Sequence, residues 1–223
     1  MRLSKMELAK IIDSTNVRQT ANKSEIEELC TEAVQYGFRC VCVNPVYVKS
    51  AGAILKGSGV KVSSTVGFPF GTSLTEVKRY EAEKALADGA RELDMVINLS
   101  LLKSGDYSVV KQDIGAAVNA KSEPRDMIVK VIIEAPCLTK DEKIVACKLA
   151  KEAGADFVKT ATGFFHDGAT VEDVRLMRQV VGRDMGVKAA GGIRTCAEAL
   201  AMVKAGANRI GTSAAAEIMK GAT

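Results

Sequence analysis

The sequence is poor in the residue types that mark several specialised classes of protein. It contains no tryptophan, a single histidine and only 4% aromatic residues in 223 positions. The core must therefore be built mainly from Ala, Val, Ile, Leu and Met. One histidine is too few for a His-rich zinc site, so metal-dependent chemistry is disfavoured and we expect no metal ligands. We expect His166 to lie on a solvated loop.

Long apolar runs and a strong charge of one sign are also missing. No stretch approaches the roughly 18 uncharged apolar residues of a membrane span, and charged residues interrupt the N-terminal segment, so it does not resemble a signal peptide. Lys and Arg total 31 against 27 Asp and Glu. These charges are scattered, which argues against nucleic acid as a partner. We expect a cytoplasmic protein.

Motifs for nucleotide cofactors and for a nucleophilic serine are missing too, because the sequence has no P-loop, dinucleotide fingerprint or G-x-S-x-G. The composition has six cysteines, which we interpret as reduced and mostly buried thiols. Cys40 and Cys42 share a predicted strand, and we expect their thiols to point to opposite faces.

What is present is an alternation of short β-branched runs with long segments rich in Ala, Glu and Lys. The runs predict strands at Ile11–Thr15, Cys40–Val43, Val60–Val66, Glu92–Ile97, Ile128–Ile133, Asp156–Thr160, Gly186–Ala189 and Asn208–Gly211. The segments between them predict helices at Ser24–Tyr36, Thr75–Asp88, Ser104–Lys121, Lys140–Ala153, Val171–Val181 and Thr195–Ala205.

Capping signals support these boundaries. Thr139 and Thr170 each precede an acidic residue three positions on, as at a helix start. A Gly-Ala pair follows three of the predicted helices, at Gly89, Gly154 and Gly206, where a left-handed cap is typical. This recurrence indicates repeated βα units without a linker between domains.

Eight such units in a chain of this length predict an α/β fold, a (β/α)8 TIM barrel with an extra N-terminal helical segment. We expect residues 1–223 to form a single catalytic domain. The alternative is an open doubly wound sheet, which usually has fewer strands and a glycine-rich fingerprint after its first strand.

Two lysines lie late in predicted buried strands, where lysine is uncommon. Lys159 and Lys188 are one βα unit apart, so we expect them on adjacent strands at similar height. Burial and mutual repulsion would lower both amine pKa values, and a neutral amine can form a Schiff base with a carbonyl. The alternative is a pair of salt-bridged or partly solvated strand lysines.

Asp94 is the third candidate, in the middle of a predicted strand. A buried carboxylate is costly unless it is paired, and a lysine on a nearby strand would pair it and allow proton transfer. A purely structural ion pair is the alternative.

Glycine-rich turns follow the last two predicted strands. Gly191 and Gly192 precede one helix, and Gly211 and Ser213 precede the last one. Helix N-termini bind phosphate, and barrel enzymes often place phosphate at these two loops. Turns also need glycine for their own sake, so each pair alone is a weak signal.

Together these residues resemble the deoxyribose-phosphate aldolases, a family of class I aldolases. The resemblance covers residues 11–213 and rests on motifs at Val41–Pro45, Val66–Gly71, Glu92–Asn98, Leu101–Tyr107, Val129–Glu134, Gly154–Thr160 and Val187–Thr195. It implies reversible cleavage of 2-deoxy-D-ribose 5-phosphate to acetaldehyde and D-glyceraldehyde 3-phosphate, a step of deoxyribose catabolism.

The resemblance also implies roles for individual residues. Lys159 matches the Schiff-base lysine, Lys188 the second lysine that keeps it deprotonated, and Asp94 the acid/base residue. The substrate-binding positions that match are Asp13, Thr15, Thr162, Gly191, Gly192, Gly211 and Ser213. No cofactor is implied, and the family commonly forms homo-oligomers, dimers or tetramers.

Three positions depart from the family pattern: Ser14, Ala161 and Ala214 replace a histidine and two serines. The change at Ala214 implies that backbone N–H groups hold most of the phosphate. Two alternatives to the aldolase stay open, a non-catalytic barrel that binds sugar phosphates and a lysine aldolase with another acceptor aldehyde.

Overall fold

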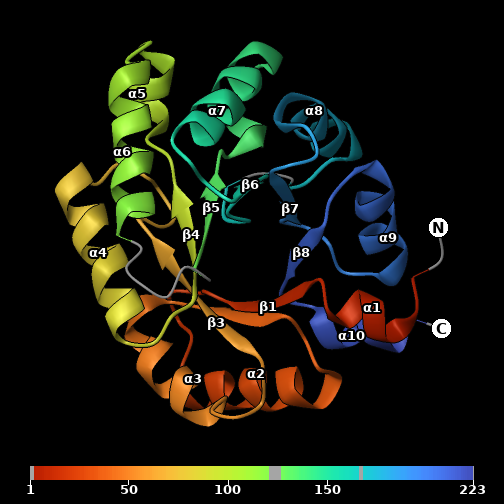
Figure 1. The fold of residues 1–223 in the computed structure, drawn as a ribbon. Helices are drawn as coiled ribbons and strands as arrows, with labels where there is room; N and C mark the ends of the chain where they lie inside the picture. The colour runs from red at the N-terminus through yellow and green to blue at the C-terminus, as the bar shows by residue number, and fades with distance from the viewer. Residues whose placement is uncertain (1–2, 121–126, 166–167, 223) are drawn as a thin grey trace.

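The computed structural model describes residues 3–120, 127–165 and 168–222. Parallel strands follow one another in chain order around a closed barrel, and the first strand pairs with the last (Figure 1). The strands are β1 (Ile12–Asn16), β2 (Cys40–Val43), β3 (Lys61–Val66), β4 (Glu92–Val96), β5 (Ile128–Ile132), β6 (Phe157–Lys159), β7 (Gly186–Ala190) and β8 (Arg209–Thr212). The predicted (β/α)8 barrel is confirmed, and the open-sheet alternative is wrong.

Helices surround the barrel on its outer side (Figure 1). They are α1 (Lys5–Ala9), α2 (Lys23–Tyr36), α3 (Val48–Ile54), α4 (Thr75–Ala87), α5 (Leu99–Lys103), α6 (Tyr107–Asn119), α7 (Lys140–Glu152), α8 (Val171–Val181), α9 (Cys196–Ala205) and α10 (Ala215–Lys220), with 3-10 turns η1 (Pro45–Tyr47) and η2 (Ala135–Cys137). The short α1 packs on α10 and is the expected N-terminal helical segment. Within the described ranges, no helix is long and apolar enough to span a membrane.

The expected capping interactions are present. The Thr139 hydroxyl accepts the Glu142 N–H, and the Glu142 carboxylate accepts the Thr139 N–H in return. Thr170 accepts the N–H of Asp173 at the start of α8. Gly206 ends α9 in the left-handed conformation. These local signals set where α7 and α8 begin and where α9 ends.

One predicted helix starts later than expected. The sequence predicts a helix from residue 104 to residue 121, whereas α6 begins at Tyr107 and ends at Asn119, and α5 is a separate helix that ends at Lys103. Gly105 lies between them with φ of 80°, a conformation that a helix cannot continue through. Lys121 lies outside the described residues. The helices α3 and α5 were not predicted.

Strand residues alternate between an apolar outer layer and a polar interior. Val41 and Val43 face the helices and belong to the hydrophobic core. Cys40 and Cys42 face the interior, where their sulfurs lie 3.9 Å from Glu92 Oε2 and 3.8 Å from Asp94 Oδ2. The expectation that these thiols point to opposite faces is wrong, because residues two apart on a strand share a face.

The barrel interior is charged, where barrels more often hold branched apolar side chains. Seven ionisable side chains of β1, β4, β5, β6, β7 and β8 are buried there: Asp13, Glu92, Asp94, Lys130, Lys159, Lys188 and Arg209. The apolar layer between sheet and helices stabilises the fold, so the interior is available for chemistry.

Candidate active site

A cavity of about 570 Å³ opens at the carboxyl ends of the strands. Its wall is formed by α2 and by the ends of β1, β2, β3, β6, β7 and β8, with the loops that follow β1, β6, β7 and β8. The predicted site residues on this wall are Thr15, Lys159, Thr162, Gly191, Gly192, Gly211 and Ser213. The structure therefore brings most of the predicted site to one place.

Asp13 does not lie on that wall. Its side chain is fully buried, and its carboxylate accepts hydrogen bonds from Lys188 Nζ at 2.6 Å and Arg209 Nη1 at 2.7 Å. The position predicted for substrate contact is thus occupied by a carboxylate that orients Lys188.

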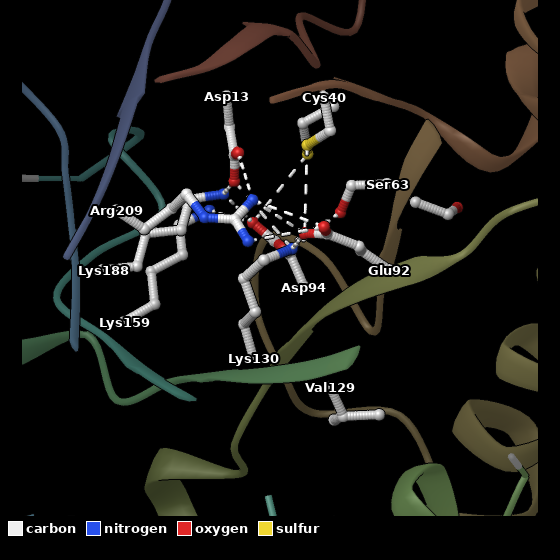
Figure 2. Close-up of polar contacts among 12 residues, drawn as sticks. Asp13, Cys40, Ser63, Glu92, Asp94, Val129, Lys130, Lys159, Lys188 and Arg209 are labelled. Carbon is white, nitrogen blue, oxygen red and sulfur yellow. Dashed lines mark hydrogen bonds and ion pairs between the residues drawn. The ribbon is translucent and has the colours of Figure 1, made fainter. Parts of the chain in front are cut away.

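The three predicted catalytic side chains form one hydrogen-bonded group (Figure 2). Lys159 and Lys188 are register partners on β6 and β7, as the sequence predicts. Their Nζ atoms bind the same oxygen, Asp94 Oδ2, at 2.8 and 2.7 Å. Lys188 and Asp94 are fully buried, whereas Lys159 is on the cavity wall. Lys159 is therefore the amine that a substrate can reach.

The sequence analysis did not identify three charged residues of this group, which are Glu92, Lys130 and Arg209. Lys130 on β5 binds Asp94 Oδ1 at 2.8 Å and Glu92 Oε2 at 2.7 Å. Arg209 on β8 binds Glu92 as well, at 3.1 Å (Figure 2). The signal that could have found Lys130 is the one that found the other two lysines, a lysine inside an apolar strand run.

The carboxylates, rather than the neighbouring lysines, dominate the electrostatics of the group. Burial alone raises the pKa of Asp94, but the ammonium groups of Lys130, Lys159 and Lys188 outweigh it and hold the pKa well below its usual range. Burial alone lowers the pKa of Lys188, but Asp13 and Asp94 outweigh it and raise the pKa. The predicted lowering of the Lys188 pKa is wrong, because attraction to Asp13 and Asp94 outweighs both burial and repulsion from Lys130.

The ion pairs of the interior distinguish Lys159 from the other lysines. Three carboxylates face four cationic side chains in the interior, an excess of one positive charge if all are ionised. Lys188 binds Asp13 and Asp94, whereas Lys159 has one carboxylate contact, to Asp94. Lys159 thus has the fewest ion pairs of the lysines in this group, and it is the one on the cavity wall. A neutral amine is the form that attacks a carbonyl.

The interior also contains a cluster whose geometry could suit a metal ion. Ligand atoms of Asp13, Cys40 and Glu92 lie within 4.8 Å of one another. Lys130 and Arg209 already bind these carboxylates, so a further cation would meet repulsion there. The charges around this cluster therefore fit a metal ion poorly. His166 lies outside the described residues.

The glycine-rich loops after β7 and β8 are joined to each other and to the loop after β6. The Thr212 hydroxyl donates to Ile193 O at 2.6 Å, and Ala169 N donates to Gly191 O at 3.0 Å. Gly191 has φ of 94°, and a Cβ there would lie 2.8 Å from Gly168 Cα. Close backbone packing thus holds the rim of the cavity that the sequence assigns to phosphate.

Four phenylalanines connect the loops after β3 and β6, two strands that are not neighbours. Phe68 meets Phe164 edge to face at 5.2 Å between ring centroids, and Phe70 lies 5.3 Å from Phe165. We call Phe68, Phe70, Phe164 and Phe165 the aromatic bridge. Phe164 lines the cavity, so the aromatic bridge borders it.

Comparison with known proteins gives one consistent answer. The model of the DeoC/LacD family aldolases matches residues 8–220. The chain is 62% identical to a deoxyribose-phosphate aldolase of Thermococcus gammatolerans over 97% of both chains, and 59% identical to that of Thermococcus kodakarensis over 99% of both.

Solved structures agree with these relatives. A putative deoxyribose-phosphate aldolase from Coccidioides immitis superposes with a TM-score of 0.94 at 44% identity, covering 99% of this chain and 87% of that one. The deoxyribose phosphate aldolase from Aeropyrum pernix, described as a unique tetramer, gives 0.91 at 38% identity, covering 98% and 92%. Its barrel and that of this chain therefore share one architecture over nearly their whole length.

Proposed function

Because the chain belongs to the DeoC/LacD family of aldolases, we propose that it is a deoxyribose-phosphate aldolase. The reaction is the reversible cleavage of 2-deoxy-D-ribose 5-phosphate to acetaldehyde and D-glyceraldehyde 3-phosphate. The observation that carries the proposal is the pair of lysines on one buried carboxylate, of which one reaches the cavity.

The reaction starts at Lys159. Its neutral amine adds to the C1 aldehyde of the sugar, and loss of water gives a protonated imine. The imine withdraws electrons from the C2–C3 bond. When the C3 hydroxyl loses its proton, that bond breaks, glyceraldehyde 3-phosphate leaves and an enamine remains on Lys159. Protonation of the enamine carbon and hydrolysis release acetaldehyde and restore the amine.

Lys188 and Asp94 supply the proton transfers. Asp94 Oδ2 accepts from both lysines and holds the Lys188 ammonium group beside the reacting amine, so Lys188 can donate the proton that leaves with water and then accept the proton of the C3 hydroxyl. Because Asp94 stays ionised, it also stabilises the cationic imine on Lys159. General acid and base groups so placed contribute about 10²- to 10⁴-fold to a rate.

The substrate is held by the rest of the cavity wall. Thr15 and Thr162 offer hydroxyls, and the loops at Gly191, Gly192, Gly211 and Ser213 offer N–H groups to the phosphate. Asp13 acts on the substrate through Lys188. The reaction uses only side chains of this chain. We place the enzyme in the cytoplasm as a homo-oligomer, a dimer or a tetramer; the Aeropyrum pernix relative is described as tetrameric.

Borohydride trapping tests the proposal. The protein is incubated with deoxyribose 5-phosphate and sodium borohydride, then digested for peptide mass mapping. A reduced adduct on Lys159 is expected, and K159L should abolish both the adduct and turnover. An unmodified Lys159 in folded protein that binds the sugar phosphate would instead support a non-catalytic barrel.

A second comparison separates aldolases with different acceptors. Turnover of deoxyribose 5-phosphate should exceed that of deoxyribose, because the phosphate loops contribute binding only to the first. Equal turnover of both sugars would indicate another acceptor aldehyde.

A further inference from the structure

Glu134 has an unusual backbone conformation for its residue type. It directly follows β5, with φ of 47° and ψ of 58°, and it is the one non-glycine residue with positive φ in the part of the chain that the structure describes. Side chains with a Cβ are disfavoured there, and such residues persist where the surroundings hold them, often at functional sites. Glu134 is also almost fully buried, at 2% exposure.

The unusual turn places the Glu134 carboxylate beside the segment that follows Lys159. Ile133 N donates to Lys159 O at 3.0 Å, and Ala135 N donates to Thr160 O at 2.8 Å. Next to these two backbone bonds, Glu134 Oε2 accepts the N–H of Thr162 at 3.0 Å. Beyond the end of the β5–β6 ladder, the carboxylate thus continues the connection between the two strands.

Thr162 passes this constraint on to the cavity wall. Its hydroxyl accepts the N–H of Phe164 at 3.2 Å, and both residues line the cavity with Lys159. Phe164 in turn packs on Phe68 in the aromatic bridge. One buried carboxylate therefore fixes the wall from the nucleophilic lysine to the aromatic bridge.

We propose that Glu134 is a positioning residue of the aldolase reaction, which aligns the Lys159–Phe164 segment by holding the Thr162 N–H. This inference rests on the proposed function, because the aligned segment carries the Schiff-base lysine. The left-handed backbone conformation of Glu134 directs its carboxylate toward the Thr162 N–H. The strained conformation is therefore retained because it aligns the Lys159–Phe164 segment.

Three variants at this position separate alignment from stability. E134Q keeps an acceptor oxygen, E134A removes it, and E134G removes it while allowing the left-handed backbone without strain. We expect E134A and E134G to lower kcat about 100-fold, the effect of misplacing a reacting group by about 1 Å. E134Q should lose about fivefold or less, since a neutral acceptor makes a bond about half as strong.

The melting temperature of each variant measures stability separately from kcat. E134G should melt at or above the temperature of E134A, yet share its loss of kcat. V110A is the matched control, because Val110 is a fully buried core residue of α6 outside the cavity wall. It should lower the melting temperature and leave kcat of the folded enzyme unchanged. If kcat instead follows melting temperature across all four variants, Glu134 has only a structural role and the proposal fails.

The rate of borohydride trapping with acetaldehyde keeps this test apart from the proposed substrate. It needs the Lys159 amine but no phosphorylated sugar. Slow trapping in E134A with rescue in E134Q supports the proposal even if deoxyribose 5-phosphate is not the substrate. Equal trapping rates in E134A and wild type overturn it, and a wild-type Lys159 that traps no acetaldehyde overturns the proposed function as well.

Discussion

Asp94 is a single carboxylate bound by three ammonium groups, so its substitution separates the nucleophile from the proton relay. In D94N a neutral amide replaces the charge that stabilises the imine. We expect kcat to fall by at least about 100-fold, while acetaldehyde still forms a trapped adduct on Lys159. Steady-state kinetics and peptide mapping check both parts.

D141N is the control for that experiment, since Asp141 is an exposed carboxylate in the first turn of α7. It should match wild type in kcat. A D94N enzyme with wild-type kcat would show that Asp94 serves only as a structural ion pair.

Cys42 lines the cavity, yet we expect it to be unreactive. Burial and the nearby Asp94 raise the pKa of its thiol to about 11. The thiolate is the reactive form, so Cys42 stays a protonated thiol between pH 7 and 9. Iodoacetamide followed by mass spectrometry should modify Cys42 only after the protein is unfolded in urea. Rapid alkylation of folded protein at pH 8 would contradict the raised pKa.

At this scale the sequence predicts which residues matter better than it predicts their charge states. Lys159, Lys188 and Asp94 were identifiable because charged residues inside apolar strand runs are unusual. The direction of the Lys188 pKa was not, because it depends on which carboxylates approach Nζ. Asp13 is 175 positions from Lys188, and only the closed barrel brings them together.

Gly211 on β8 leaves space for the side chain of Lys188 on the neighbouring strand β7. A Cβ on Gly211 would lie 2.8 Å from Lys188 Cε and 3.0 Å from Ala190 Cβ. We expect G211A to displace Lys188 from Asp94 and to lower kcat about 100-fold through misalignment. Enzyme kinetics and the melting temperature measure the two effects.

Gly115 offers the matched control, because it lies within α6 and a Cβ there would meet nothing within 4 Å. G115A should leave kcat unchanged and raise the free energy of unfolding by about 0.5–1 kcal/mol through helix propensity. If G211A has wild-type kcat, Lys188 does not depend on that space.

Helices and strands with a regular hydrophobic pattern were predictable from the sequence. The exceptions are places where a single residue or a short loop determines the structure. The strands follow from β-branched runs and the helix starts from Thr139 and Thr170. The division of α5 from α6 depends on Gly105, whose positive φ breaks an otherwise helical pattern. The contact between Glu134 and Thr162 joins two loops, and local sequence patterns do not specify such a contact.

The buried carboxylates make the whole molecule sensitive to acid. The pKa values of Asp13 and Asp94 lie below their usual range in the folded state, while an unfolded Asp titrates near about 3.9. The unfolded chain therefore binds more protons in acid. The contribution of these residues to stability is present above about pH 4 and is lost as the pH falls through the folded values.

Urea unfolding between pH 7 and pH 2.5 measures this dependence. We expect the free energy of unfolding to fall steeply below about pH 4. D13N should be less stable at pH 7 and show a shallower dependence, because one of the two depressed carboxylates is gone. An acid dependence identical in D13N and wild type would place the effect elsewhere.

Because β1 pairs with β8, the barrel of a newly synthesised chain can close only after its last strand has been made. Asp13 is synthesised early, whereas its partner Arg209 follows 196 residues later. Until the last strand is added, β1 and β7 are both open edges and Asp13 lacks the cation that the final strand supplies. Ring closure therefore completes the sheet and the charge balance in one event. Lys159 therefore reaches its final electrostatic environment only after the ribosome has synthesised β8, the last strand of the barrel.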